Sequence, residues 1–187
     1  MQFFVKEAKT VKALILVASM LLILGCEART DKSDTGGVLL EVELVDFPVR
    51  ASVNAADVVQ IPTIEIDSIV INPNRPTSQL MNVAVDSVEV RYFRADGGTR
   101  VPTPYIARLI GTVPVGGTLT FSNIPVLSID QMRNPPLSDL LFINGGFDKE
   151  TGKNFITLNM EIRVFGKTLS GDDVASEPRL HRLELVQ

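Results

Sequence analysis

The chain has 187 residues, of which 18 are lysine or arginine and 22 are aspartate or glutamate, so its formal net charge at pH 7 is −4. This acidic balance disfavours binding to nucleic acid or to anionic lipid through the overall electrostatic field. One histidine and one cysteine are too few for the common classes of zinc site, which need several such ligands.

The first 25 residues have the parts of a secretory signal peptide. A positively charged region holds three lysines, Lys6, Lys9 and Lys12, and an apolar stretch follows from Ala13 to Leu24. A membrane-spanning helix is the alternative, but these twelve residues would cover roughly 18 Å, well short of a hydrocarbon core about 30 Å thick. The sequence therefore predicts a signal peptide over residues 1–25.

The end of this segment resembles the lipobox of bacterial lipoproteins, in which an aliphatic residue stands three positions before a cysteine and a small residue directly before it. Gly25 and Cys26 fit that pattern, whereas Ile23 replaces the commoner leucine and Leu24 is bulkier than the usual occupant. The resemblance implies that the thiol of Cys26 receives a diacylglycerol, that the preceding peptide is removed, and that a further chain such as palmitate acylates the new amino group. An ordinary secreted protein with Cys26 as a core thiol is the alternative.

A lipidated Cys26 determines where the protein is expected. Two acyl chains already anchor a protein stably, so three would hold it permanently in a membrane of the cell envelope. In enteric bacteria an aspartate after the lipidated cysteine resembles an inner-membrane retention signal, and Glu27 at that position favours the outer membrane. With this thiol used, the domain is expected to contain no disulfide.

Residues 27–37 show no apolar periodicity, so residues 26–37 are predicted to be the lipidated cysteine and a flexible tether. A coil of this length spans roughly 18 Å, which would keep the domain close to the bilayer. The remaining residues 38–187 have the size of one domain.

Alternating apolar and polar residues predict strands along this domain at 40–44, 64–70, 88–92, 105–113, 119–121, 156–164 and 183–185. The clearest is Ile156–Val164, in which Met160 and Ile162 are expected to face the core. The stretch 105–113 is weaker. Between Val85 and Val88 the alternation changes phase at Asp86-Ser87, which predicts a bulge or a strand that passes between sheets.

Turn signals separate the predicted strands, and hairpins are expected to close at Asp96-Gly97-Gly98, Gly116-Gly117, Gly145-Gly146, Gly152-Lys153 and Ser170-Gly171-Asp172. No window has helical apolar spacing over ten residues. About seven short strands predict an all-β fold with a single antiparallel β-sandwich over residues 38–187. In architecture this is similar to immunoglobulin and fibronectin type III domains, although the tryptophan and paired cysteines of antibody domains are missing. A small β-barrel is the alternative.

Few residues suggest catalysis or metal binding. His181 is the histidine available to a serine–histidine–acid triad, but no nucleophile-elbow motif accompanies it, so we interpret it as a structural or surface residue. Asp148–Asn154 places side-chain oxygens at alternate positions, in faint similarity to a calcium loop, but Lys149 and Lys153 oppose a cation. We interpret this segment, and the weaker Asp172-Asp173, as solvated turns, and we predict no catalytic residue, no metal site and no cofactor.

Arginine and aromatic residues interleave around the predicted turn at residues 96–98: Arg91, Tyr92, Phe93, Arg94, Arg100, Tyr105 and Arg108. Such a set can stack on bases or sugars. The simpler interpretation is a strand with its apolar face inward and its arginines in solvent. The segment Arg133–Leu137 is predicted to be an exposed loop suited to partner contact.

Two hypotheses follow. The first is a membrane-anchored, non-enzymatic lipoprotein whose β-sandwich is a structural or interaction module in a cell-envelope or surface assembly, with the membrane and an envelope protein as partners and no nucleic acid. The alternative is an anchored carbohydrate-binding protein or a carboxylate-dependent hydrolase. The anchor and the all-β body favour the first.

Overall fold

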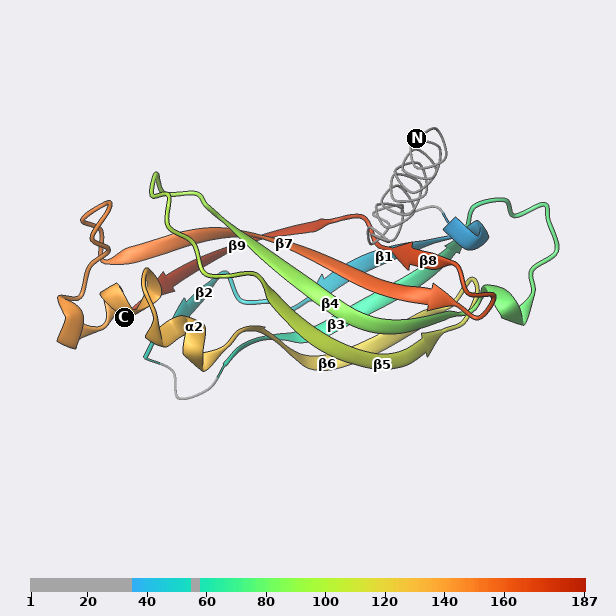
Figure 1. Ribbon diagram of the computed structural model, residues 1–187, viewed down its shortest axis with the longest axis horizontal. Coiled ribbons are helices and arrows are strands. Elements are labelled where there is room, and N and C mark those ends of the chain that lie inside the picture. The colour runs from blue at the N-terminus through green and yellow to red at the C-terminus, as the bar shows by residue number, and fades with distance from the viewer. Residues whose placement is uncertain (1–34, 55–57) are drawn as a thin grey trace, which may run out of the picture. The chain divides into compact units, whose positions relative to one another are not determined.

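The computed structural model describes residues 35–54 and 58–187 (Figure 1). The predicted signal peptide 1–25, the predicted lipidation site Cys26 and residues 27–34 of the predicted tether lie outside the described residues. Thr35–Gly37 form a short 3-10 turn, η1, directly before the first strand. The helices in this described part are short, and none of them has the length and apolar character that crossing a membrane would require.

The smaller of two β-sheets has three antiparallel strands in the order β1-β3-β6. Their bounds are β1 (Val38–Val45), β3 (Val59–Val70) and β6 (Thr118–Leu127). The first and last residues of β1 pair with Val70 and Thr63 of β3. The predicted strands at 40–44, 64–70 and 119–121 lie in this sheet.

The larger sheet has six strands, in the order β2-β9-β7-β4-β5, with β8 beside β7. Their bounds are β2 (Arg50–Ser52), β4 (Val83–Arg94), β5 (Tyr105–Val113), β7 (Phe155–Thr168), β8 (Asp173–Ala175) and β9 (Arg179–Val186). This sheet contains the four remaining predicted strands, and the weakest of them, 105–113, coincides with β5.

The expectation of purely antiparallel pairing is wrong at β2, which runs parallel to β9 with Arg50 opposite Glu184. After β1 ends in the smaller sheet, the chain crosses to the edge of the larger sheet without reversing direction. It therefore meets β9, which runs the same way. All other strand pairs among the described residues are antiparallel.

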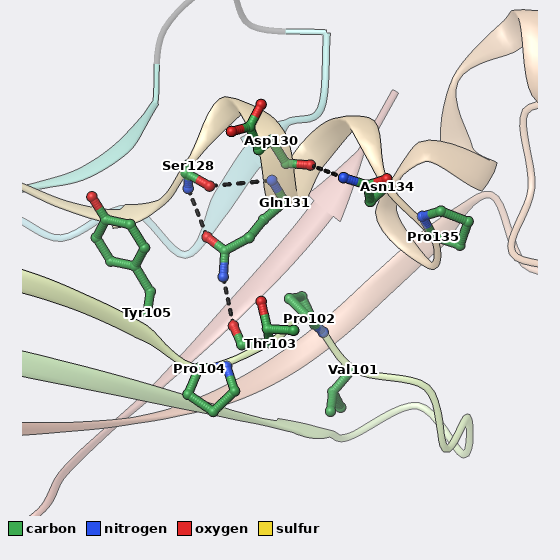
Figure 2. A pocket seen from close by; sticks show the side chains of 10 residues that line it. All are labelled: Val101, Pro102, Thr103, Pro104, Tyr105, Ser128, Asp130, Gln131, Asn134 and Pro135. Atoms are coloured by element: carbon green, nitrogen blue, oxygen red, sulfur yellow. Dashed lines mark hydrogen bonds between the residues drawn. The ribbon is translucent and has the colours of Figure 1, made fainter.

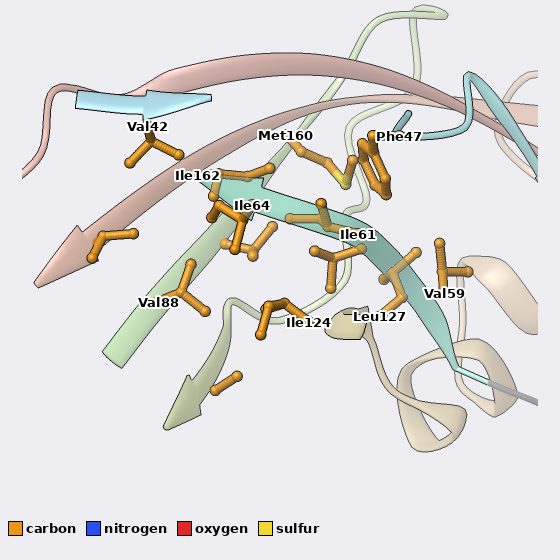
Figure 3. Close-up of a cluster of buried hydrophobic side chains, with 14 of the residues drawn as sticks. Val42, Phe47, Val59, Ile61, Ile64, Val88, Ile124, Leu127, Met160 and Ile162 are labelled. Atoms are coloured by element: carbon orange, nitrogen blue, oxygen red, sulfur yellow. The ribbon is translucent and has the colours of Figure 1, made fainter. Parts of the chain in front are cut away.

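Side chains from both sheets share one hydrophobic core (Figure 3). On β7, alternate residues from Ile156 to Val164 are fully buried, which confirms the predicted face and the inward positions of Met160 and Ile162. They pack in the same cluster as Ile64 and other side chains of the smaller sheet. Period-two alternation is what a sheet with one buried face requires.

The predicted irregularity at Asp86-Ser87 is confirmed as a bulge. The registers of β4 with β5 and with β7 both shift between Val85 and Ser87. Asp86 is the extra residue relative to β7 and is exposed, while Val85 and Val88 on either side are both buried. The bulge thus keeps the apolar face of β4 inward across the change of phase.

Some predicted hairpins are absent from the described structure. Gly116-Gly117 joins β5 to β6, which belong to different sheets, and Gly145-Gly146 and Gly152-Lys153 lie in the helical and turn segment before β7. Ser170–Asp172 does close the β7–β8 hairpin, and Asp96–Gly98 begins the connection between the paired strands β4 and β5. The short elements η2 (Gln79–Met81), α2 (Ile129–Arg133), η3 (Leu137–Leu140) and η4 (Phe142–Asn144) complete the fold.

The long strands run between two ends of the described domain, which we call the tether end and the loop end. At the tether end, β1 begins at Val38 and β7 ends at Thr168, near Gly36. At the loop end, β4 ends at Arg94 and β7 begins at Phe155, close to α2, η3 and η4. Figure 1 shows η1 and β8 at one side and α2 at the other. The fourteen residues of β7 span roughly 45 Å between the two ends.

Candidate interaction surface at the loop end

Seven charged side chains gather at the loop end, and we call them the ionic cluster: Arg94, Asp96, Arg100, Asp139, Asp148, Lys149 and Glu150. Arg94 is central, and its side chain is only 2% exposed. It is the last residue of β4 and shares the inward parity of Val90 and Tyr92. The expectation that the arginines of this strand lie in solvent is therefore wrong for Arg94.

The guanidinium of Arg94 is held by two carboxylates. Its Nε and Nη2 donate to the two oxygens of Asp96 at 2.7 and 3.0 Å, and Nη2 also donates to Oδ2 of Asp148 at 2.8 Å. Asp148 lies 54 residues away in sequence and is fully buried. The bidentate geometry with Asp96 and the contact with Asp148 join the end of β4 to the turn before β7.

These contacts hold the carboxylates in their charged form. Burial alone would raise the pKa of Asp148, but hydrogen bonds from Arg94 and Thr151 outweigh that effect and lower the pKa to about 2. For Asp96 too, burial acts upward, and hydrogen bonds from Arg94 and from the backbone of Thr157 and Gly98 lower its pKa. Burial acts to lower the pKa of Arg94, but its hydrogen bonds and charge interactions with Asp96 and Asp148 raise it.

A second set of contacts joins the cluster to η3. Asp139 is buried and forms two ion pairs. Its two carboxylate oxygens lie 3.0 Å from Nη2 of Arg100 and 2.9 Å from Nζ of Lys149. The carboxylate of Glu150 accepts hydrogen bonds from the backbone N–H of Arg100 at 2.9 Å, and from the hydroxyl and backbone N–H of Thr99 at 2.7 and 3.0 Å, and these bonds lower its pKa. The cluster therefore fixes the β4–β5 connection, η3 and the turn before β7 to one another.

Three apolar side chains beside the cluster point into solvent, and we call them the apolar tip: Phe142, Ile143 and Phe147. Phe142 and Ile143 are 81% and 86% exposed. Their backbone is fixed, because the Asn144 side chain donates to the carbonyl of Ser138 at 2.8 Å and Gly146 N–H donates to that of Leu141 at 3.1 Å. Exposed apolar side chains on an ordered loop are typical of a contact surface.

A pocket of about 360 Å³ opens between α2 and residues 101–105 (Figure 2). Gln131 crosses it, accepting the N–H of Ser128 at 2.8 Å and donating to the carbonyl of Thr103 at 2.6 Å. Tyr105, Asp130 and Asn134 contribute an aromatic ring, a carboxylate and an amide to its lining. The pocket thus combines groups that can stack on a ligand with groups that can form hydrogen bonds.

The structure does not assemble the predicted platform of arginine and aromatic residues. Tyr92 is buried, and its hydroxyl donates to the carbonyl of Val126 inside the core. Burial raises the pKa of that hydroxyl. Phe93 is half-exposed beside Leu180, while Tyr105 lines the pocket near α2. These aromatic residues therefore belong to three separate environments.

The other sequence-derived candidates have clear surroundings. The ring of His181 packs on Phe47 with centroids 4.4 Å apart, and its Nε2 is 3.2 Å from the carbonyl oxygen of Pro48. The interpretation of Asp148 as part of a solvated turn is wrong, because its carboxylate is buried against Arg94. Of the predicted exposed loop 133–137, the first three residues are exposed and the last two are buried.

No group of three or more histidine, cysteine, aspartate or glutamate residues is arranged to hold a metal ion within residues 35–54 and 58–187. In the turn 148–154, both carboxylates face hydrogen-bond donors of the protein itself. Asp148 faces Arg94 and Thr151, and Glu150 faces Thr99 and Arg100.

Sequence reasoning missed the apolar tip and the ionic cluster. The run Leu140–Ile143 has neither helical nor strand periodicity, so it gave no element prediction. Its one signal is position, since it lies between two prolines and the Gly145-Gly146 pair. Of the two carboxylates that hold Arg94, Asp96 is two residues away, but Asp148 is distant in sequence and only the fold brings it to Arg94.

Comparison with known proteins identifies no family. No protein-family description matches the chain, and no curated protein matches it. A solved structure described as "X-ray structure of Northeast Structural Genomics Consortium target SoR45" is similar at 11% sequence identity with a TM-score of 0.35, over 78% of this chain and 83% of that one. A likeness this weak supports no conclusion about fold or function.

Proposed function

We propose that this protein is a lipid-anchored, non-enzymatic interaction module of the cell envelope, which presents its loop end to a partner protein. The observation that carries the proposal is the placement of the apolar tip. Phe142 and Ile143 are exposed at the end of the sheets opposite Val38, where the chain arrives from the predicted anchor at Cys26. A partner that offers an apolar groove would bury these side chains.

Site-specific photocrosslinking in cells tests the contact. A photoreactive residue at Ile143 is expected to give a discrete product in the membrane fraction, and Phe142→Asp in the same chain is expected to remove it. Leu180 is the matched control, because it is also apolar and well exposed but lies on β9. Products of equal yield from positions 143 and 180, or none from either, would contradict the proposal.

The anchor has a separate test. We propose that Cys26 is acylated and that the protein resides in the outer membrane, as the resemblance to the lipobox and Glu27 suggest. The intact mass of membrane-extracted protein is expected to match a chain that starts at an acylated Cys26, with density fractionation placing it in the outer membrane. Wild type that is as soluble and unmodified as Cys26→Ala would contradict the anchor.

We also propose that the two sheets form a β-sandwich of immunoglobulin-like architecture. Support comes from the single hydrophobic core that both sheets share. In an experimental structure, the mean strand directions of the two sheets should then differ by about 30°, and an angle near 90° would contradict this class.

Carbohydrate binding is a second candidate, favoured by the pocket beside α2. Tyr105 supplies a ring for stacking, and Asp130 and Asn134 supply polar groups at its rim. Asp130 is the one carboxylate among the residues that line this pocket, whereas glycoside hydrolysis commonly uses two, so the pocket favours binding over hydrolysis. Glycan-array binding that Tyr105→Ala abolishes and Phe93→Ala leaves intact would support this candidate, and blank arrays would contradict it.

A further inference from the structure

The tether end carries a second apolar surface, which we call the apolar rim: Ile71, Leu80 and Leu169. Leu80 is 59% exposed, Leu169 is 52% exposed and Ile71 is 49% exposed. The backbone brings Leu80 and Leu169 together, because Ser170 N–H donates to the Leu80 carbonyl at 3.0 Å and Leu169 N–H to that of Asn82 at 2.9 Å. Ile71 lines one groove with Met81, the chain neighbour of Leu80. Two strand connections thus expose aliphatic side chains at one end: β3–β4, which holds Ile71 and Leu80, and β7–β8, which holds Leu169.

This rim lies where the chain arrives from the predicted anchor. The N–H of Ile71 donates to the carbonyl of Gly37, the last residue of η1, at 3.2 Å. Gly37 and Ile71 also line a groove of about 510 Å³ with the apolar side chains of Val70, Pro76 and Met81. In Figure 1 these segments lie at the end that holds η1 and β8.

We propose that the apolar rim docks on the phospholipid bilayer, so that the domain stands on the membrane with its tether end down and its loop end outward. This inference rests on the proposed lipid anchor at Cys26. The bilayer is the expected partner of the rim because the predicted anchor is close by. Eight residues separate Cys26 from Thr35, and they can span at most about 30 Å.

That short connection keeps the rim beside the bilayer at all times. A surface held by a short linker meets its target at millimolar effective concentration, so even weak apolar insertion is sustained. Exposed apolar side chains at a membrane surface settle about 5–10 Å into the boundary between headgroups and acyl chains. Because the chain is acidic overall, the contact depends on apolar burial and suits a zwitterionic phospholipid.

The docked orientation would also serve the proposed partner contact. The rim and the apolar tip lie at opposite ends of β7. Lipid contact at one end therefore directs Phe142 and Ile143 away from the membrane to which the protein is anchored.

The absence of tryptophan from the sequence permits a direct test. The full acylated protein, carrying Leu80→Trp or Leu169→Trp as its one tryptophan, is reconstituted into phosphatidylcholine vesicles with brominated acyl chains. Phe142→Trp is the matched control at the loop end. Each substituted side chain is exposed in the wild type, and urea midpoints equal to wild type verify that the variants fold.

Blue-shifted emission and several-fold stronger quenching at positions 80 and 169 than at position 142 are expected. Vesicle flotation separates the two proposals. Protein that floats with the vesicles but shows equal quenching at both ends, or stronger quenching at position 142, overturns the docking and leaves the anchor intact. Protein that does not float overturns both.

Discussion

Replacing Arg94 by methionine should destabilise the protein severely, because the fold would keep two buried carboxylates and lose their shared cation. The Arg94 side chain is 2% exposed, as is that of Asp96, and Asp148 is fully buried. Removing one partner from a buried, hydrogen-bonded ion pair costs about 3–5 kcal/mol. We therefore expect Arg94→Met to lower the free energy of unfolding at pH 7 by about that amount, measured by urea denaturation.

Acid should weaken the wild type through the same contacts. The pKa of Asp148 falls from its usual value near 3.8 to about 2 in the fold. A group whose folded pKa is lowered contributes stability that is present above the unfolded pKa and is lost as the pH falls through the folded pKa. At about 1.4 kcal/mol per pKa unit, Asp148 contributes about 2 kcal/mol, and this is lost between about pH 4 and pH 2.

The two measurements together isolate Arg94. In Arg94→Met this acid-dependent loss should shrink, because the guanidinium that contributes most to lowering the pKa of Asp148 is gone and only the hydrogen bonds from Thr151 still oppose the effect of burial. Arg50→Met is the matched control, since Arg50 is well exposed and pairs with Glu184 at the surface, where removal costs about 1 kcal/mol or less. Equal urea midpoints for the two variants, or an unchanged acid slope in Arg94→Met, would refute the role of the ionic cluster.

Three further predictions concern the core. Met160→Asp places an unpaired charge at a fully buried position and should prevent folding in far-UV circular dichroism, whereas Asn159→Asp on the opposite face should melt like the wild type. Tyr92→Phe removes a buried hydroxyl that donates to a main-chain carbonyl, and a thermal melt should show a loss of about 1–3 kcal/mol. In Gly166→Ala the new Cβ would lie 2.5 Å from the carbonyl oxygen of Ala84 on the neighbouring strand. The strands β4 and β7 must therefore shift, at a cost of about 1–3 kcal/mol, which should lower the urea midpoint. An unchanged midpoint would show that the strands move apart at no cost.

The long strands could be predicted because each has one buried face. In β7 the apolar residues that alternate from Ile156 to Val164 are the side chains that lie in the core. The three-residue strands β2 and β8 are too short to show a period, so no apolar pattern predicts them. The helix α2 did leave a signal, since Ser128 and Gln131 have the spacing of a capping box and form one.

Arg94 shows how far the same rule extends. Alternation through Val90 and Tyr92 already places position 94 on the inward face of β4. Asp96 lies two residues further along the chain, but the sequence alone does not show that it pairs with Arg94, and the simpler expectation places Arg94 in solvent. Asp148 lies 54 residues further along the chain and reaches Arg94 only through the pairing of β4 with β7. A charged residue at an inward position is therefore a sequence signal for a distant counter-ion.

The ionic cluster and the apolar tip are parts of one arrangement. Asp139 lies in η3, before the tip. Its carboxylate forms ion pairs with Arg100 and with Lys149, which follows the tip. The tip is therefore fixed at both of its ends by ion pairs to one buried carboxylate. A contact loop ordered before binding loses less conformational entropy when a partner covers it. Under the proposed function, the ion pairs of Asp139 would therefore hold Phe142 and Ile143 in a conformation ready for a partner.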